Sequence, residues 1–166
     1  MKVTTLRTIV GVTTPLILAG SVQAGFLGIS AASRPNDFGL LVVNIYAEFD
    51  RPGEDFMLAV TGTPLNPMLI EVIGGTFYNH GFGSDRPPPG ALVDAFPSLA
   101  YDSFVTIGVR WVADPPFPPQ DNMVIVPGFP GLSGTQLSTN SSGWAVAPIE
   151  PQGDPFNPFF APIDGG

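Results

Sequence analysis

The chain has few residues that could do chemistry: among its 166 residues are one histidine, His80, and no cysteine. Nucleophilic triads and zinc sites depend on imidazole or thiolate groups, so those chemistries lack their usual parts. The nucleophile-elbow, phosphate-loop and HExxH patterns are also missing. His80 lies between Asn79 and Gly81 and is interpreted as a structural or surface histidine. We therefore expect no catalytic residue and no bound cofactor.

Carboxylates are the remaining option for catalysis, because a glycosidase needs only two acids placed across a sugar. The candidates are Glu48, Glu71, Asp94 and Asp102. An acid within a strand is usually a solvated, outward side chain, so the structural interpretation is favoured for any pair. A carboxylate-dependent, glycan-active enzyme stays open as an alternative.

Two acidic loops offer the hard oxygen ligands that calcium prefers. The first holds Asp50, Glu54 and Asp55, and the second holds Glu150 and Asp154, with Asn157 beside them. Neither loop has EF-hand spacing, and Asp and Asn are common in turns for backbone reasons. Turn formation is therefore the favoured interpretation, with calcium binding as the alternative.

The aromatic residues raise a further alternative, a carbohydrate-binding module in which a ring stacks on a sugar. Trp111 continues the apolar positions of its predicted strand and is assigned to the core. Trp144 follows the polar residues 138–143 and is the candidate for an exposed, glycan-binding ring.

The first 24 residues have the order of a signal peptide. Lys2 and Arg7 precede an apolar stretch over residues 8–20, and Val22 and Ala24 are the small residues of a cleavage site. The stretch is shorter than the roughly 20 apolar residues of a spanning helix. We expect cleavage before Gly25, no membrane insertion after signal removal, and a secreted or cell-surface product of residues 25–166.

The predicted mature chain is strongly acidic. Both positive residues of the leader are lost, which leaves four Arg against all 14 Asp and Glu. Such a surface repels phosphate backbones, which excludes nucleic acid and anionic membranes as favoured partners. Cations, glycans and components of the cell envelope remain as candidate partners.

Alternation of apolar and polar residues predicts strands. Residues 41–49 place Leu41, Val43 and Ile45 on one face, which we expect to be buried, and residues 56–61 are expected to pair with them through the polar loop 50–55. The second strong alternation covers residues 103–111. Shorter candidates are residues 68–73, 76–79, 123–126 and 144–146.

Helical periodicity is limited to a turn within residues 91–99, and Gly and Pro number 20 each. These features predict an all-β, antiparallel β-sandwich with long Pro/Gly-rich loops, whose jelly-roll or Ig-like topology is left open. We expect a single domain over residues 25–166, with an extended polyproline-like segment at residues 114–119.

Four phrases resemble an uncharacterised family of secreted, β-rich bacterial proteins. They are YAEF at residues 46–49, GTFY at 75–78, DSFVTIG at 102–108 and SGW at 142–144. Members of this family often carry a C-terminal PEP-type sorting signal with an apolar anchor, or a dockerin-type module. This chain stops at Gly166 with neither, so the resemblance allows for a C-terminally truncated frame. It implies extracellular or envelope placement and supplies no activity.

Together these features favour a secreted or envelope-associated, non-catalytic β-sandwich with a structural or adhesive role. The alternative is a carbohydrate-binding module or a carboxylate-dependent, glycan-active enzyme.

Overall fold

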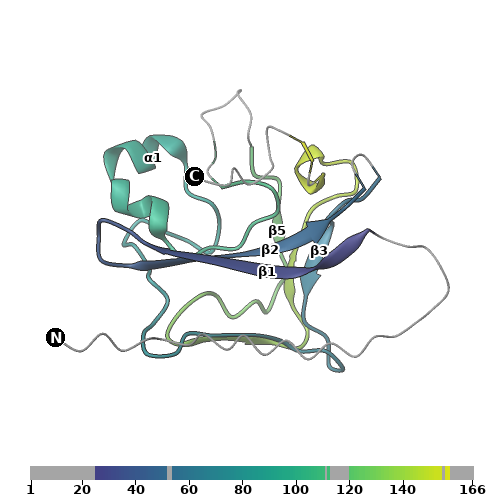
Figure 1. Cartoon of the computed structure of the whole chain (residues 1–166), viewed down its shortest axis with the longest axis horizontal. Coiled ribbons are helices and arrows are strands. Elements are labelled where there is room, and N and C mark those ends of the chain that lie inside the picture. Colours follow the sequence, from purple (N-terminus) through teal and green to yellow (C-terminus); the bar gives the residue numbers. More distant parts are fainter. Residues whose placement is uncertain (1–24, 52–53, 111, 113–119, 155, 158–166) are drawn as a thin grey trace.

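The computed structural model describes residues 25–51, 54–110, 112, 120–154 and 156–157, and short antiparallel strands dominate it (Figure 1). Within these ranges the strands pair in three small sheets, ordered β1–β2, β3–β7–β5 and β4–β6. The predicted class, mostly β with antiparallel pairing, is confirmed. The predicted leader, residues 1–24, lies outside the described residues.

The elements follow one another along the chain in the order β1 (Phe26–Pro35), β2 (Leu41–Phe49), β3 (Ala59–Thr61), β4 (Met68–Glu71), α1 (Gly90–Ala95), the 3₁₀ helix η1 (Pro97–Tyr101), β5 (Val124–Ile125), β6 (Gln136–Thr139), β7 (Gly143–Ala145) and the 3₁₀ helix η2 (Pro151–Gly153).

The strand predicted at residues 41–49 is present as β2, but its predicted partner is wrong. β2 pairs with β1, whereas residues 59–61 form β3 and pair with β7. The turn between β1 and β2 explains why β2 pairs with β1. Asn36 Oδ1 accepts the backbone N–H groups of Phe38 at 3.0 Å and Leu40 at 2.9 Å, and Gly39 has a φ of 75°. This local turn joins the two strands directly, as Asn and Gly favour.

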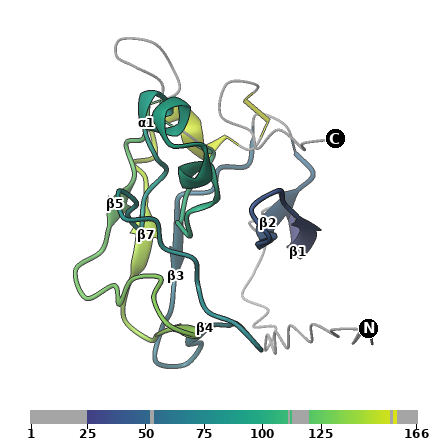
Figure 2. The ribbon, with the colours of Figure 1, turned by 90° about the vertical axis from the view of Figure 1, so that its left-hand side faces the viewer.

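The apolar face of β2 is open to solvent, so the prediction that it is buried is wrong. Leu41, Val43 and Ile45 are 54%, 48% and 46% exposed. The reason is that β2 belongs to a two-stranded ribbon, and no described element packs over this face. Figure 2 shows the β1–β2 ribbon as a separate layer beside the strands β3, β5 and β7.

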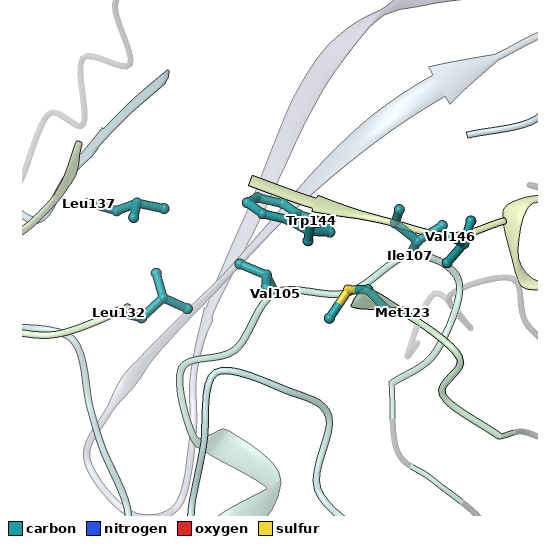
Figure 3. Close-up of a cluster of buried hydrophobic side chains, with 7 residues drawn as sticks. All are labelled: Val105, Ile107, Met123, Leu132, Leu137, Trp144 and Val146. Atoms are coloured by element: carbon teal, nitrogen blue, oxygen red, sulfur yellow. The ribbon is translucent and has the colours of Figure 1, made fainter. Parts of the chain in front are cut away.

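The buried core lies elsewhere, between the sheets β3–β7–β5 and β4–β6 and the segment 103–109. Trp144 of β7 lies at its centre, with Leu137 of β6 on one side and Ile107 on the other (Figure 3). The buried members of this cluster are Val105, Ile107, Met123, Leu132, Leu137, Trp144 and Val146.

The segment 103–109 is buried without being a strand, which corrects the second strong prediction. Its alternate residues Val105, Ile107 and Val109 are buried, as the pattern indicates. The backbone does not enter a ladder, and it turns at Gly108, which has a φ of 71°. Side chains take the carbonyl groups instead: Trp144 Nε1 donates to the Thr106 oxygen at 3.1 Å, and Gln152 Nε2 donates to that of Ile107 at 2.9 Å.

The shorter predictions have mixed outcomes. Strands predicted at residues 68–73, 123–126 and 144–146 correspond to β4, β5 and β7, and the helical turn at 91–99 corresponds to α1 and η1. Residues 76–79 are not a strand, and neither β1 nor β6 was predicted. Trp111 and the segment 114–119 lie outside the described residues.

Replacing Trp144 with alanine should lower the free energy of unfolding by about 3–5 kcal/mol, because it empties the centre of the core. Denaturant unfolding measures this loss. The matched control is Leu65→Ala, at a position that is 86% exposed, where the change should stay within about 0.5 kcal/mol. Equal effects at the two positions would contradict the described core.

Candidate functional site

A shallow hollow of about 300 Å³, with polar and apolar parts of similar extent, lies where residues 79–85 meet residues 130–133. Its lining is formed by Asn79, His80, Gly83, Ser84, Asp85, Pro130, Gly131, Leu132 and Ser133. Amide, hydroxyl, imidazole and carboxylate groups therefore converge on one opening. Loops, rather than the ends of long strands, supply all of them.

Asp102, which follows η1, fixes the shape of the loop 79–85. Its Oδ1 accepts the backbone N–H of His80 at 2.7 Å, and its Oδ2 accepts that of Ser84 at 3.0 Å. A Cβ at Gly83 would overlap this carboxylate, so a glycine is required there. The loop is thus wrapped around a buried acid.

The environment of Asp102 shifts its acidity. Burial raises the pKa of the Asp102 carboxyl, and the N–H groups of His80 and Ser84 oppose part of that rise. The pKa stays above its ordinary value. Asp102 was a candidate glycosidase acid, and the structure places it beneath the loop as a hydrogen-bond acceptor.

Asp85 connects the hollow to the core. Its Oδ1 accepts the backbone N–H of Leu132 at 2.7 Å, and its backbone oxygen accepts that of Val105 at 3.1 Å. Leu132 and Val105 are both members of the buried cluster. The floor of the hollow is therefore held at a fixed position relative to the core.

An aromatic cluster adjoins the hollow. The His80 ring lies 5.8 Å from Phe82 and 6.0 Å from Phe96, and the two Phe rings lie 4.8 Å apart. Both Phe side chains are exposed. Sequence reasoning missed these residues, although the phrase His80-Gly81-Phe82 beside a turn-rich loop was a usable signal.

This arrangement lacks the geometry of a nucleophile with its base. The Ser84 hydroxyl bonds to the backbone of Arg86, and His80 Nδ1 accepts the N–H of Phe82 at 3.2 Å. The Ser84 hydroxyl and the His80 ring, the two groups that such a pair would need, are thus both bonded to nearby backbone groups. The Phe82 and Phe96 rings beside the hollow leave an aromatic surface exposed to solvent.

The first predicted calcium loop is occupied by internal contacts. Asp55 is buried and accepts from Gly25 N at 3.0 Å and from Arg51 Nη2 at 2.6 Å, while Glu54 lies 3.6 Å from Arg51 Nη1. Asp50 is exposed, and its backbone N–H donates to the Gly25 oxygen.

The second predicted loop is engaged in a similar way. Glu150 accepts the Asn122 side-chain amide at 2.8 Å, and Asp154 accepts the backbone N–H of Phe156 at 2.9 Å. Among the described residues, no group of three or more His, Asp or Glu side chains gathers as a set of metal ligands. Calcium binding stays a prediction.

The other candidate glycosidase acids lie on separate elements: Glu48 on β2, Glu71 on β4 and Asp94 on α1. Asp102 follows η1. The expectation that Trp144 is exposed is wrong, because its side chain is only 7% exposed and its indole N–H bonds to the backbone. The Phe129 ring packs against it with the ring centres 5.8 Å apart, which the polar residues before Trp144 in the sequence did not reveal.

Comparison with known protein families, with characterised proteins and with solved structures found no match to this chain. Within the described ranges, none of the helices has the length and hydropathy needed to cross a bilayer.

Replacing Asp102 with alanine should lower the free energy of unfolding by about 1–3 kcal/mol, because two backbone N–H groups lose their acceptor. Urea unfolding at neutral pH measures this effect.

The pH dependence provides a second readout for Asp102. Its pKa is raised in the folded chain, so the folded state binds the proton more tightly and loses stability as pH rises from the ordinary Asp value through the raised one. In the Asp102→Ala protein, the free energy of unfolding should not show this fall with rising pH. Identical slopes in both proteins would contradict a raised pKa.

Proposed function

We propose that this chain is an exported, non-catalytic protein of the cell surface or its surroundings, with a structural or adhesive role. Two carboxylates that were candidates for chemistry support this proposal, because Asp55 and Asp102 accept hydrogen bonds from backbone N–H groups of other segments. The observation that carries it is the exposed apolar face of the β1–β2 ribbon.

This surface, called here the ribbon face, contains no charged side chain. The strand register places Ile29, Ala31 and Ser33 of β1 on the same side as Leu41, Val43 and Ile45 of β2. Ile29 is exposed like its neighbours on β2. An isolated two-stranded ribbon is only marginally stable in water, so covering one face of it by another surface is favoured.

We infer that the ribbon face contacts a second copy of this chain. Its larger apolar side chains each expose about half of their surface, so with the flanking Phe26 and Leu27 the patch amounts to roughly 600 Å², the upper range for a monomer. A standard stable interface covers roughly 800 Å² per partner, so the patch would supply most of one. Because the face lacks charge, two acidic copies can meet there without burying like charges.

We also infer the finer architecture, an antiparallel sandwich. Support comes from the core, where Leu137 of β6 and Trp144 of β7 belong to one cluster although their strands belong to different sheets. Two sheets that share an apolar interior are the defining feature of a sandwich.

Self-association of residues 25–166 tests the proposed role. Sedimentation velocity should show a concentration-dependent dimer, strengthened by added salt because salt screens the repulsion between acidic copies. Val43→Lys should weaken the association at least tenfold, since burying an unpaired ammonium costs several kcal/mol.

The matched control for Val43→Lys is Leu65→Lys, which adds the same charge at an exposed apolar position away from the ribbon face. It should leave the dimer unchanged. A wild-type chain that stays monomeric throughout, or two variants that behave alike, would contradict the role of the ribbon face.

The hollow supports a second candidate function, glycan binding, because the exposed rings of Phe82 and Phe96 adjoin its polar lining. A glycan array should then give signals that Phe82→Ala weakens about tenfold, as loss of a stacking ring does. The control is Phe156→Ala, another exposed phenylalanine. No signal from the wild-type chain, or equal loss in both variants, would remove this candidate.

A further inference from the structure

Asp50, Arg51 and Asp55, which follow β2 in the sequence, lie around the backbone of Gly25, the residue that directly precedes β1. The Gly25 N–H donates to Asp55 Oδ1 at 3.0 Å, and the Gly25 oxygen accepts the Asp50 N–H at 3.0 Å. A Cβ at Gly25 would overlap carboxylate oxygens of both Asp50 and Asp55. These three residues and Arg51, called here the Gly25 cradle, therefore admit only glycine at this position.

One acceptor of the Gly25 cradle, Asp55 Oδ2, and one donor, Arg51 Nε, are buried and have no hydrogen-bond partner. The Asp55 side chain is only 4% exposed, and Arg51 Nη2 contacts its Oδ1 at 2.6 Å. Its Oδ2 is buried and has no hydrogen-bond partner. Leaving a buried carboxylate oxygen unpaired is costly, so a hydrogen bond donated to Asp55 Oδ2 would stabilise the arrangement.

The charges around Gly25 favour a cation. Asp50, Asp55 and Arg51 all face it, and Glu54 is paired with Arg51. Burial alone would raise the pKa of Asp55. Hydrogen bonds from Gly25 and Arg51 lower the pKa by more than burial raises it, so the pKa lies below its ordinary value. Three carboxylates, with Asp55 ionised at neutral pH, are thus balanced by a single guanidinium.

We infer that the Gly25 cradle binds the α-ammonium group that Gly25 acquires when the leader is cut after Ala24. This inference rests on the predicted cleavage and adds a binding site to it. In the uncut chain the Gly25 nitrogen carries one hydrogen, which Asp55 Oδ1 accepts. In the processed chain the nitrogen carries three hydrogens and a positive charge, so a second hydrogen can reach Asp55 Oδ2.

The site explains how processing would stabilise the fold. The ring of Phe26 lies 5.7 Å from that of Phe49, so β1 and β2 already meet beside the Gly25 cradle. A charge-assisted bond from the new terminus to a buried carboxylate would fasten the first residue of the mature chain to the loop after β2. Any uncut or extended form keeps only the single neutral N–H bond.

The bound ammonium should have a raised pKa, above the ordinary α-amino value of about 7.7–8.0. A group whose pKa is raised on folding contributes its full stability below the ordinary value and loses it as pH rises through the raised value. The contribution is therefore present at pH 7 and disappears in alkaline solution.

The test compares residues 25–166 with a free Gly25 amine against the same chain acetylated at Gly25. Acetylation removes the charge and keeps one N–H donor, as in the uncut chain. The free amine should give an unfolding constant about tenfold smaller at pH 7, as a charge-assisted bond implies. The two chains should converge at alkaline pH, and Asp50→Asn, at an exposed residue that leaves Asp55 in place, should reduce the difference.

An NMR titration of the labelled Gly25 amine supplies a readout independent of stability, and Asp55→Asn should return its pKa toward the ordinary range. An ordinary pKa in the wild-type chain, or equal unfolding constants for the free and acetylated chains, would overturn the inference. Amino-terminal sequencing of the exported protein tests the cleavage separately. If the exported protein begins at a residue other than Gly25, the predicted cleavage is wrong and the inference fails with it. The dimer measurements on the ribbon face do not depend on the cleavage and would be unaffected.

Discussion

The fold depends on pairing the backbone of a segment that lies in the core without strand neighbours. Residues 103–109 bring Val105, Ile107 and Val109 into the interior, and a buried carbonyl without a partner would cost about as much as a lost hydrogen bond. The indole of Trp144 and the amide of Gln152 meet this need at Thr106 and Ile107. Both side chains are consequently fixed inside, where they also fill space.

The same principle recurs at the acidic side chains. Asp102 accepts two N–H groups of the loop 79–85, Asp85 accepts that of Leu132, and Asp121 pairs with Arg86 at 2.9 Å. In a chain with few cations, backbone N–H groups are the most abundant partners for carboxylates. Asp102, which was a candidate for chemistry, therefore fixes the shape of a loop, as Asp85 fixes the position of Leu132.

The sequence predicted well which stretches are extended and which of their residues share a face. It predicted poorly which segments lie next to one another in the fold. Alternation located β2 at residues 41–49, and it correctly identified Val105, Ile107 and Val109 as buried. It could not distinguish a strand from an extended segment whose carbonyls bond to side chains, because both have a period of two residues. It also could not show which surface covers an apolar face, so the ribbon face was assigned to the core.

The site was less predictable for the same reason. Ala, Ser and Gly dominate β1, so its pairing with β2 arises from the Asn36 turn and not from an apolar pattern. The hollow combines residues 79–85 with residues 130–133, which are far apart in the sequence and are held together by Asp85, while Asp102 holds the first loop. Trp144 was assigned to the surface from its polar neighbours in sequence, whereas its neighbours in space are apolar.

Hydrogen exchange of the Trp144 indole proton, followed by NMR, tests the central claim that side chains satisfy the buried segment 103–109. A hydrogen-bonded, buried indole should exchange only when the core opens, at a rate set by the free energy of unfolding. Exchange at the rate of a solvent-exposed indole would mean that Trp144 does not hold the Thr106 carbonyl, and would contradict the account of the core.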